Sequence, residues 1–360
     1  MDRKKLVQVY MDGIFSEMDE KERVGSYNHT AGVAQFCAFL AKKRGLNTEL
    51  AYISGLLHDV YFTNDNKRIF HAINGSEMVR VAFKNELKDL FTEEEQMLIR
   101  SAIFHHSDKA HVHDAYDEVL KDADLLQHWL WAPEEKYITK RTLNLQKEFG
   151  LSLSKLPEEK PNRFLISVFK RAAFADCAEE LAEKQIRGER SDDEYMKLIR
   201  YFPEKTAFDE LKNAWCAAFV FHCAITAGLK LPIRYAPTAN TRFACVEAWL
   251  EWGQKNSFCH FEKDGFIPER GDIVIYDNII SPENKPENCP WYDHIGIVLE
   301  AEGSTLTVAE GNVNNQNVSG VVERARDRHI GCFVRIPEDY VYDCWKIDYK
   351  TGKWRQEDYK

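Results

Sequence analysis

The spacing of apolar residues changes once along this chain, and that change limits its possible folds more than any other feature. Up to about residue 190 the pattern is helical, as in Val33, Phe36, Cys37 and Leu40, which follow i, i+3, i+4, i+7 spacing. Beyond it, short runs rich in Ile and Val lie between glycines that mark turns, which is typical of β-strands. The pattern therefore predicts two domains, an all-α helical bundle followed by an α+β domain.

The boundary is expected at the polar stretch 187–194, which interrupts the helical pattern and is followed by Pro203. This gives a first domain over 1–190, a linker over 191–204, a second domain over 205–340 and a C-terminal tail over 341–360. The length of 360 residues agrees with two domains of about 100–200 residues each.

Local signals place several elements within these domains. Asn47 can cap a helix that leads into His58-Asp59, and the capping box 92–95 begins a helix that runs to His105-His106. In the second half, a helix over 217–227 should end at Gly228. The expected strands cover 272–276, 294–300 and 305–309.

The composition of the chain indicates which binding partners and which cellular location to expect. The formal net charge of −10 and the lack of a basic tract argue against binding to nucleic acid or anionic membranes. No signal peptide or membrane-spanning stretch is expected. The nine cysteines form no CxxC pair, which argues against a disulfide framework and favours a cytoplasmic location.

The first half contains a set of metal-binding residue types: His29, the pair His58-Asp59, and Asp124. Imidazole and carboxylate ligands together suit first-row divalent metals, and residues on separate helices of a bundle can converge on one ion. Such an ion can activate a water molecule and polarise a phosphoryl oxygen.

These residues lie in motifs that resemble the HD superfamily of metal-dependent phosphohydrolases over roughly residues 20–190. The motifs are Asn28-His29-Thr30-Ala31-Gly32-Val33-Ala34, Gly55-Leu56-Leu57-His58-Asp59 and Asp122-Ala123-Asp124. The resemblance implies that His29, His58, Asp59 and Asp124 ligate a divalent metal such as Mn, Fe, Mg or Ni. A shift in the alignment of the last motif would replace Asp124 by Asp122.

Three further histidines, His71, His105 and His106, fall where the dinuclear branches of the superfamily place additional ligands. These branches include proteins similar to the symmetrical dinucleoside-tetraphosphate hydrolases, so the resemblance implies one or two ions. The alternative is that His105 and His106 are polar residues at a fraying helix end, where a positive charge suits the helix dipole. His111, His113 and His128 match nothing in the family and are expected at the surface.

The second half places Cys216 at the first turn of its helix, where unpaired backbone N–H groups and the helix dipole favour a thiolate. A thiolate nucleophile needs an imidazole, which in turn needs an orienting group. If 302–304 is a three-residue hairpin loop, the numbers of any two residues that pair across the hairpin add up to 606. His294 then faces Asn312, with Glu310 diagonal to it on the same sheet face. A loop one residue longer or shorter would break this arrangement.

Residues 205–337 closely resemble the CHAP family of cysteine, histidine-dependent amidohydrolases and peptidases. The matching segments are Trp215-Cys216-Ala217-Ala218-Phe219-Val220, Arg270-Gly271-Asp272-Ile273-Val274, Asp293-His294-Ile295-Gly296 and Glu310-Gly311-Asn312. The resemblance implies a papain-like fold with an antiparallel sheet. It also implies Cys216 as nucleophile, His294 as general base and Glu310 or Asn312 as the orienting residue.

Taken together, these features predict a bifunctional hydrolase. The first domain would act on a small phosphoester or nucleotide, and the second on a peptide or peptidoglycan-like amide. One alternative is a lysin-like peptidoglycan hydrolase with a regulatory HD domain. Another is a nucleotide-sensing binding protein in which one half controls the other.

Overall fold

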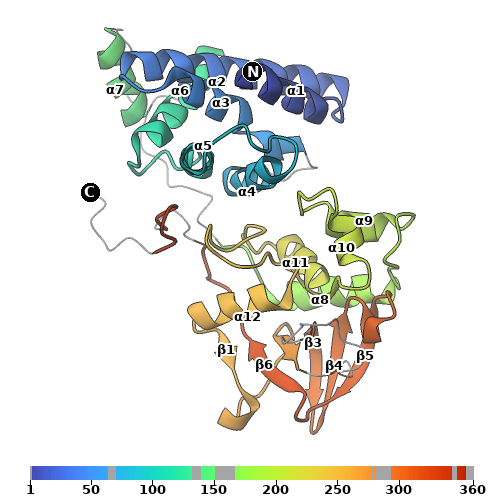
Figure 1. Ribbon diagram of the computed structural model, residues 1–360. Coiled ribbons are helices and arrows are strands. Elements are labelled where there is room, and N and C mark those ends of the chain that lie inside the picture. The colour runs from blue at the N-terminus through green and yellow to red at the C-terminus, as the bar shows by residue number, and fades with distance from the viewer. Residues whose placement is uncertain are drawn as a thin grey trace. The chain divides into compact units, whose positions relative to one another are not determined.

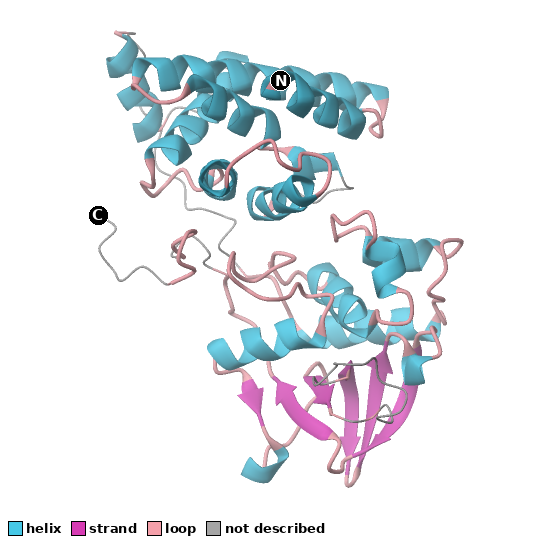
Figure 2. Ribbon diagram, viewed as in Figure 1, coloured by secondary structure: helices cyan, strands magenta, loops and turns pink. Residues whose placement is uncertain are grey.

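The computed structural model describes residues 2–63, 70–131, 139–150, 167–277, 279, 293–342 and 347–353. The chain forms two compact units, one made of Met1–Pro161 with Cys344–Lys360 and the other of Asn162–Asp343 (Figure 1). The first unit is helical, and the second combines helices with an antiparallel sheet (Figure 2). The expected all-α and α+β architecture is confirmed.

The first unit is a helical bundle around one apolar core. Its described helices are α1 (Arg3–Phe15), α2 (Glu20–Lys43), α3 (Thr48–Leu57), η1 (Val60–Thr63), α4 (His71–Lys84), α5 (Glu93–His105), α6 (Ala115–Trp131) and α7 (Lys140–Phe149). The predicted caps are present: Asn47 Oδ1 accepts from two backbone N–H groups of α3, and Thr92 and Glu95 form the capping box of α5.

Helices α2 and α3 approach each other closely at Gly55. A Cβ at this position would lie 2.6 Å from the Cα of Ala34, so only glycine allows the observed approach. This contact sets the distance between His29 on α2 and His58 at the end of α3.

The second unit contains a six-stranded antiparallel sheet in the order β1-β6-β2-β3-β4-β5. The strands are β1 (Cys259–His260), β2 (Ile273–Tyr276), β3 (His294–Glu302), β4 (Thr305–Glu310), β5 (Gly320–Ala325) and β6 (Ile330–Val334). The helical elements are α8 (Arg171–Glu183), α9 (Asp193–Ile199), α10 (Ala207–Leu211), α11 (Cys216–Thr226), α12 (Val246–Lys255), η4 (Glu262–Asp264) and η6 (Val313–Asn315). Helices α8 and α11 pack against the sheet through β3 and β4.

The division between the units lies earlier than the expected boundary at residue 190. Helix α8 belongs to the second unit, where buried Phe174 and Ala178 face α11 and the sheet. The expected linker 191–204 contains α9, which Asp192 caps and whose Tyr195 and Leu198 are fully buried. Helical spacing alone does not indicate which of two cores a helix joins.

Part of the expected C-terminal tail packs against the helical unit. Within it, residues 347–353 belong to the first unit, where Tyr349 is buried between α4 and α5. Its hydroxyl lies 2.8 Å from Ser76 Oγ, and its ring packs on Phe104 with the Arg100 guanidinium 5.5 Å from the ring centroid. This segment therefore completes the helical unit.

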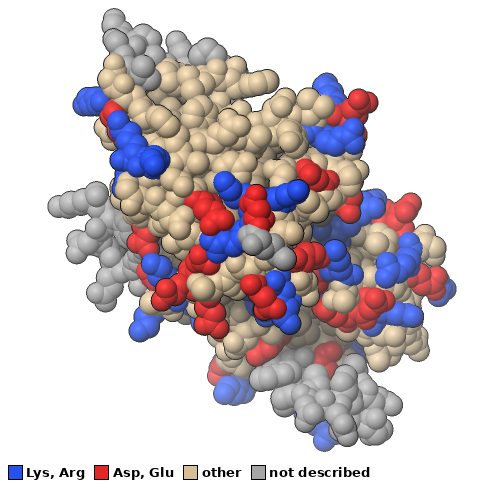
Figure 3. Space-filling view, turned by 45° about the horizontal axis from the view of Figure 1, so that its top comes forward, with Lys and Arg blue, Asp and Glu red and all other residues tan. Residues whose placement is uncertain are grey.

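Charged side chains of both signs are interspersed on the face that Figure 3 presents. None of the described helices combines the length and the hydrophobicity that crossing a bilayer requires.

Candidate functional site

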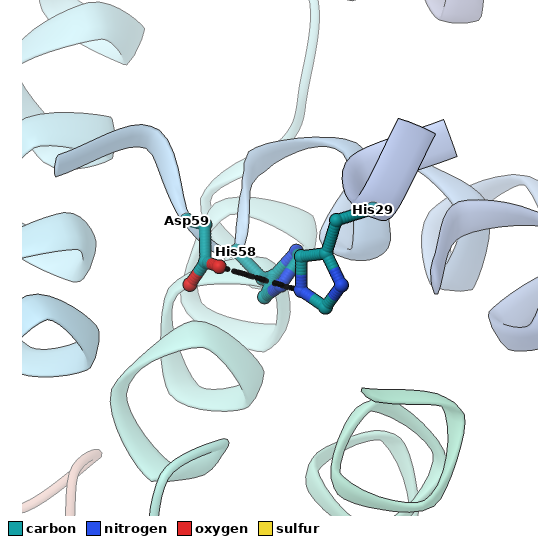
Figure 4. A group of neighbouring side chains, drawn as sticks. All are labelled: His29, His58 and Asp59. Atoms are coloured by element: carbon teal, nitrogen blue, oxygen red, sulfur yellow. Dashed lines mark hydrogen bonds and ion pairs between the residues drawn. The ribbon is translucent and has the colours of Figure 1, made fainter. Parts of the chain in front are cut away.

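The first candidate site is a cluster of His and Asp side chains at the centre of the helical unit. His29 comes from α2, and His58 and Asp59 come from the end of α3, with the ring of His29 facing the other two (Figure 4). His29 Nε2 lies 3.4 Å from Asp59 Oδ2 and 3.4 Å from Asp124 Oδ1, and 3.1 Å from His58 Nε2. Helix α6 supplies Asp124.

Asp59 contacts a second pair of histidines through its other oxygen. Its Oδ1 lies 3.5 Å from His71 Nε2 at the start of α4 and 3.4 Å from His106 Nε2 at the end of α5. This oxygen is buried, and its contacts with the two rings are longer than an ordinary hydrogen bond. Asp59 therefore lies between two groups of potential ligands, each with its ligand atoms within 4.8 Å of one another: His29-His58-Asp59 and Asp59-His71-His106.

Three of these imidazole rings are held through their Nδ1 atoms. His58 Nδ1 lies 2.8 Å from Gly55 O, His106 Nδ1 lies 2.7 Å from Ile103 O, and His29 Nδ1 lies 2.6 Å from Gln127 Oε1. An Nδ1–H that donates to an oxygen leaves the Nε2 lone pair of the neutral ring for a metal ion. These Nε2 atoms, together with the Asp59 carboxylate that they face, fit a divalent cation.

The ionisation of the cluster follows from its burial and its neighbours. Burial opposes the charge of Asp59, but His58, His106 and His29 outweigh burial and hold its pKa well below the usual range. Burial lowers the pKa of His106 to about 4, which keeps this ring neutral. Burial also acts to lower the pKa of His29, yet Asp124 and Asp59 raise it to about 10. Asp59 therefore stays ionised and places a negative charge between the two groups of histidines.

Two of the expected ligands, Asp122 and His105, lie outside the cluster. Asp122 pairs with Arg44 and Arg141 at 2.7 and 2.8 Å, so Asp124 is the carboxylate that faces the cluster. His105 is buried but points elsewhere, with Nδ1 2.9 Å from Asp117. Adjacent residues on a helix point about 100° apart, which explains why His106 joins the cluster and His105 does not.

Two histidines expected at the surface lie in the interior or at the cluster. The side chain of His113 is fully buried, with its ring stacked 3.8 Å from that of His105. His128 is partly exposed, but its Nε2 lies 3.3 Å from Asp124 and its ring packs on His29. The sequence could have indicated that His128 lies near Asp124, because residues spaced i, i+4 on one helix are neighbours.

The second candidate site joins α11 to the sheet. Cys216 is the first residue of α11, and its thiol hydrogen-bonds His294, the first residue of β3. His294 Nε2 lies 2.9 Å from Glu310 Oε2 at the end of β4. Burial acts to lower the pKa of His294, but the Glu310 carboxylate and Cys216 outweigh it and raise that pKa to about 10.

The hairpin between β3 and β4 reaches this geometry by a different register from the one predicted. Glu302 pairs with Thr305, so the turn is one residue shorter than expected. A bulge between Val298 and Glu300 then compensates, and Ile297 pairs with Ala309. The bulge returns Glu310 to the position that the predicted register required.

Asn312 has a different set of contacts from Glu310. Its Nδ2 donates to Asn213 O at 2.7 Å, and its Oδ1 accepts from Asn317 N at 2.8 Å. Asn317 Oδ1 in turn accepts from the indole of Trp215, which directly precedes Cys216. Asn312 and Asn317 thus hold the loop that begins α11, and Glu310 contacts the imidazole.

Two protein-family models match parts of this chain. Residues 26–129 match the HD domain, and residues 208–312 match the CHAP domain. The chain is an HD–CHAP fusion. The HD match contains the whole His-Asp cluster, and the CHAP match contains Cys216, His294 and Glu310. Comparisons with curated proteins and with solved structures gave no match.

Several residues of the HD–CHAP fusion that lie at these sites were not singled out from the sequence. At the HD site, Gln127 holds His29, and Lys109 Nζ lies 2.6 Å from Asp124 Oδ2. At the CHAP site, Arg324 contacts Glu310, and the ring of Tyr276 stacks on His294. Gln127 lies three residues from Asp124 on the same helix, which is the only spacing signal among them.

Proposed function

We propose that this HD–CHAP fusion is a bifunctional hydrolase, with a metal-dependent phosphohydrolase in the HD domain and a cysteine amidohydrolase or peptidase in the CHAP domain. Both families consist generally of hydrolases, which supports an enzyme of this type. The observation that carries the HD half is the anchoring of three imidazoles through Nδ1 around the Asp59 carboxylate, whose two oxygens face histidine Nε2 atoms on both sides.

In the HD domain, His29, His58, Asp59 and Asp124 would hold one divalent cation. His71 and His106 would hold a second, with Asp59 between the two. When bound, such cations polarise a phosphoryl oxygen and activate water. Lys109, about a third exposed beside Asp124, would contact a phosphate of the substrate. The substrate class is a small phosphoester or nucleotide.

In the CHAP domain, the Cys216 thiolate would attack the carbonyl carbon of an amide. The backbone N–H of Cys216, at the first turn of α11, would stabilise the developing oxyanion. As the C–N bond breaks, the His294 imidazolium gives its proton to the leaving amine and a thioester forms. His294 then takes a proton from water, which attacks the thioester and releases the carboxylic acid and the thiolate.

Glu310 supports both steps by accepting a hydrogen bond from His294 Nε2. This contact fixes the ring so that Nδ1 faces the Cys216 sulfur, and it stabilises the imidazolium. The substrate class is a peptide or a peptidoglycan-like amide.

The test is a screen of phosphoester and amide substrates on the wild type, Asp59→Asn and Cys216→Ala, with metal content measured in each. We expect Asp59→Asn to lose metal and phosphohydrolase activity, and Cys216→Ala to lose only amidase activity. The matched controls are Asp122→Asn, whose carboxylate lies outside the cluster, and Cys223→Ala, a buried thiol on the same helix as Cys216. A wild type active on neither substrate class would contradict the proposal.

A further inference from the structure

Arg324, on strand β5, forms a two-point contact with Glu310. Its Nε lies 2.9 Å from Glu310 Oε1, and its Nη2 lies 2.5 Å from Oε2, the oxygen that also accepts from His294. The Glu310 side chain is fully buried and that of Arg324 is 14% exposed. A planar guanidinium that binds both oxygens of a carboxylate fixes its orientation, which a single contact cannot do.

The four side chains form a row of alternating charge in the reactive state. The order is Arg324 positive, Glu310 negative, His294 positive and Cys216 negative as thiolate. Buried charges are tolerated when each has an opposite neighbour. Without Arg324, the remaining three groups would carry a net negative charge once the thiolate forms.

Arg324 lies outside residues 208–312, the part of the chain that matches the CHAP domain. The sequence of β5 does not indicate that Arg324 contacts Glu310, because exposed and partly covered residues simply alternate along this strand. The neighbouring Arg326 has the same side chain but pairs with Glu262, away from the site.

We propose that Arg324 is a positioning residue of the CHAP site, which holds the Glu310 carboxylate toward His294 and supplies the positive charge that balances the Cys216 thiolate. This inference rests on the proposed cysteine hydrolase function. It assigns Arg324 two separable effects, one of geometry and one of charge.

Other titratable groups face this row from the described elements around it. Tyr276 on β2 stacks on His294, with its hydroxyl near Glu310 and Arg324, and Asp327 follows β5. Cys245, which precedes α12, lies near Cys216. None of these is changed in the variants proposed below, so differences between them report on Arg324.

The experiment measures the rate of Cys216 alkylation by iodoacetamide as a function of pH, with the modified cysteine identified by mass spectrometry. The full-length variants are Arg324→Gln, which removes the charge, and Arg324→Lys, which keeps it but cannot bind both oxygens. Arg326→Gln removes an arginine–glutamate pair that lies away from Glu310, with Glu262 of η4, and is the matched control. Cys216→Ala gives the background from other thiols.

We expect Arg324→Gln to move the rise in alkylation rate to higher pH by about one unit. This is the size of effect that a unit charge exerts across about 10 Å, the order of length of a row of four contacting side chains, at an effective dielectric constant of about 20. Arg324→Lys should keep the wild-type position of this rise but lower the amidase rate, because Glu310 is less well held. Arg326→Gln should match the wild type in both measurements.

Superimposable pH profiles for Arg324→Gln and the wild type would overturn the inference about Arg324 and leave the proposed nucleophile intact. If Arg324→Gln does not fold, Arg324→Lys decides, because an unchanged amidase rate would then overturn the inference. A wild-type Cys216 that reacts no faster than a free thiol would instead overturn the proposed cysteine hydrolase function itself.

Discussion

Gly296 provides a sharp test of the CHAP site, because it lies on β3 where the Glu310 side chain crosses the strand. A Cβ at this position would lie 2.9 Å from Glu310 Cγ and 2.5 Å from Val308 Cγ1. Both neighbours are fully buried, so neither can move without disturbing the packing of β4. Forcing a methyl group into such a space costs about 1–3 kcal/mol of folding free energy.

The substitution Gly296→Ala should displace the Glu310 carboxylate from His294. A hydrogen bond to a charged group contributes about 1.5–3 kcal/mol, and about 1.4 kcal/mol corresponds to a factor of ten. We therefore expect Cys216 alkylation at neutral pH to slow by roughly tenfold to a hundredfold. Circular dichroism would verify that the variant is folded.

Gly320→Ala is the matched control for this prediction. Gly320 pairs with Glu310 from the neighbouring strand, and its added Cβ would meet only Val313 Cγ2, at an ordinary 3.5 Å. It should alkylate at close to the wild-type rate. A folded Gly296→Ala variant that reacts as fast as the wild type would refute the view that Glu310 must approach His294 for the thiol to react.

Three further predictions concern both domains. Tyr349→Phe and Ser76→Ala should each lower the free energy of unfolding by about 1 kcal/mol, and the double variant should lose less than their sum; additive losses in a denaturant-unfolding cycle would contradict the hydrogen bond. The pKa of His294 is raised from 6.5 to about 10, so its contribution to stability is complete below pH 6.5 and disappears as pH rises to about 10. The difference in Tm between the wild type and His294→Gln should shrink over that range, and a constant difference would contradict the raised pKa. Asn312→Ala should lower the amidase rate without moving the pH dependence of Cys216 alkylation, because Asn312 supports the loop before α11; a shifted profile would indicate a direct role beside the imidazole.

The sequence motifs identified most of the residues that meet at the HD site, including His29, His58, Asp59 and Asp124. The motifs did not show that His106, and not His105, contacts Asp59, because this depends on how α5 is rotated within the bundle. Asp122 and Asp124 differ in the same way, and the two arginines that bind Asp122 come from other helices. Helix rotation is determined by packing between elements, which the spacing along one element does not describe.

The CHAP hairpin shows a different limit. Alternation along β3 and β4 predicted that His294 and Glu310 share a face, and they are in contact. The prediction relied on a three-residue loop, whereas the chain has a shorter turn and a bulge whose effects cancel. Arg324 was not predicted, because nothing in a partly covered strand indicates which arginine reaches a buried carboxylate.

The burial of Tyr349 in the helical unit has a consequence for how the two domains are connected. The chain leaves the HD unit after α7, forms the CHAP unit, and returns, so the CHAP unit is in effect an insertion. A single proteolytic cut between α7 and α8 would divide the chain into two fragments, yet Tyr349 on the C-terminal fragment would still contact Ser76 and Phe104 of the helical unit through non-covalent interactions. During translation, the HD bundle emerges first, yet its Tyr349 is made only after the whole CHAP unit has been synthesised.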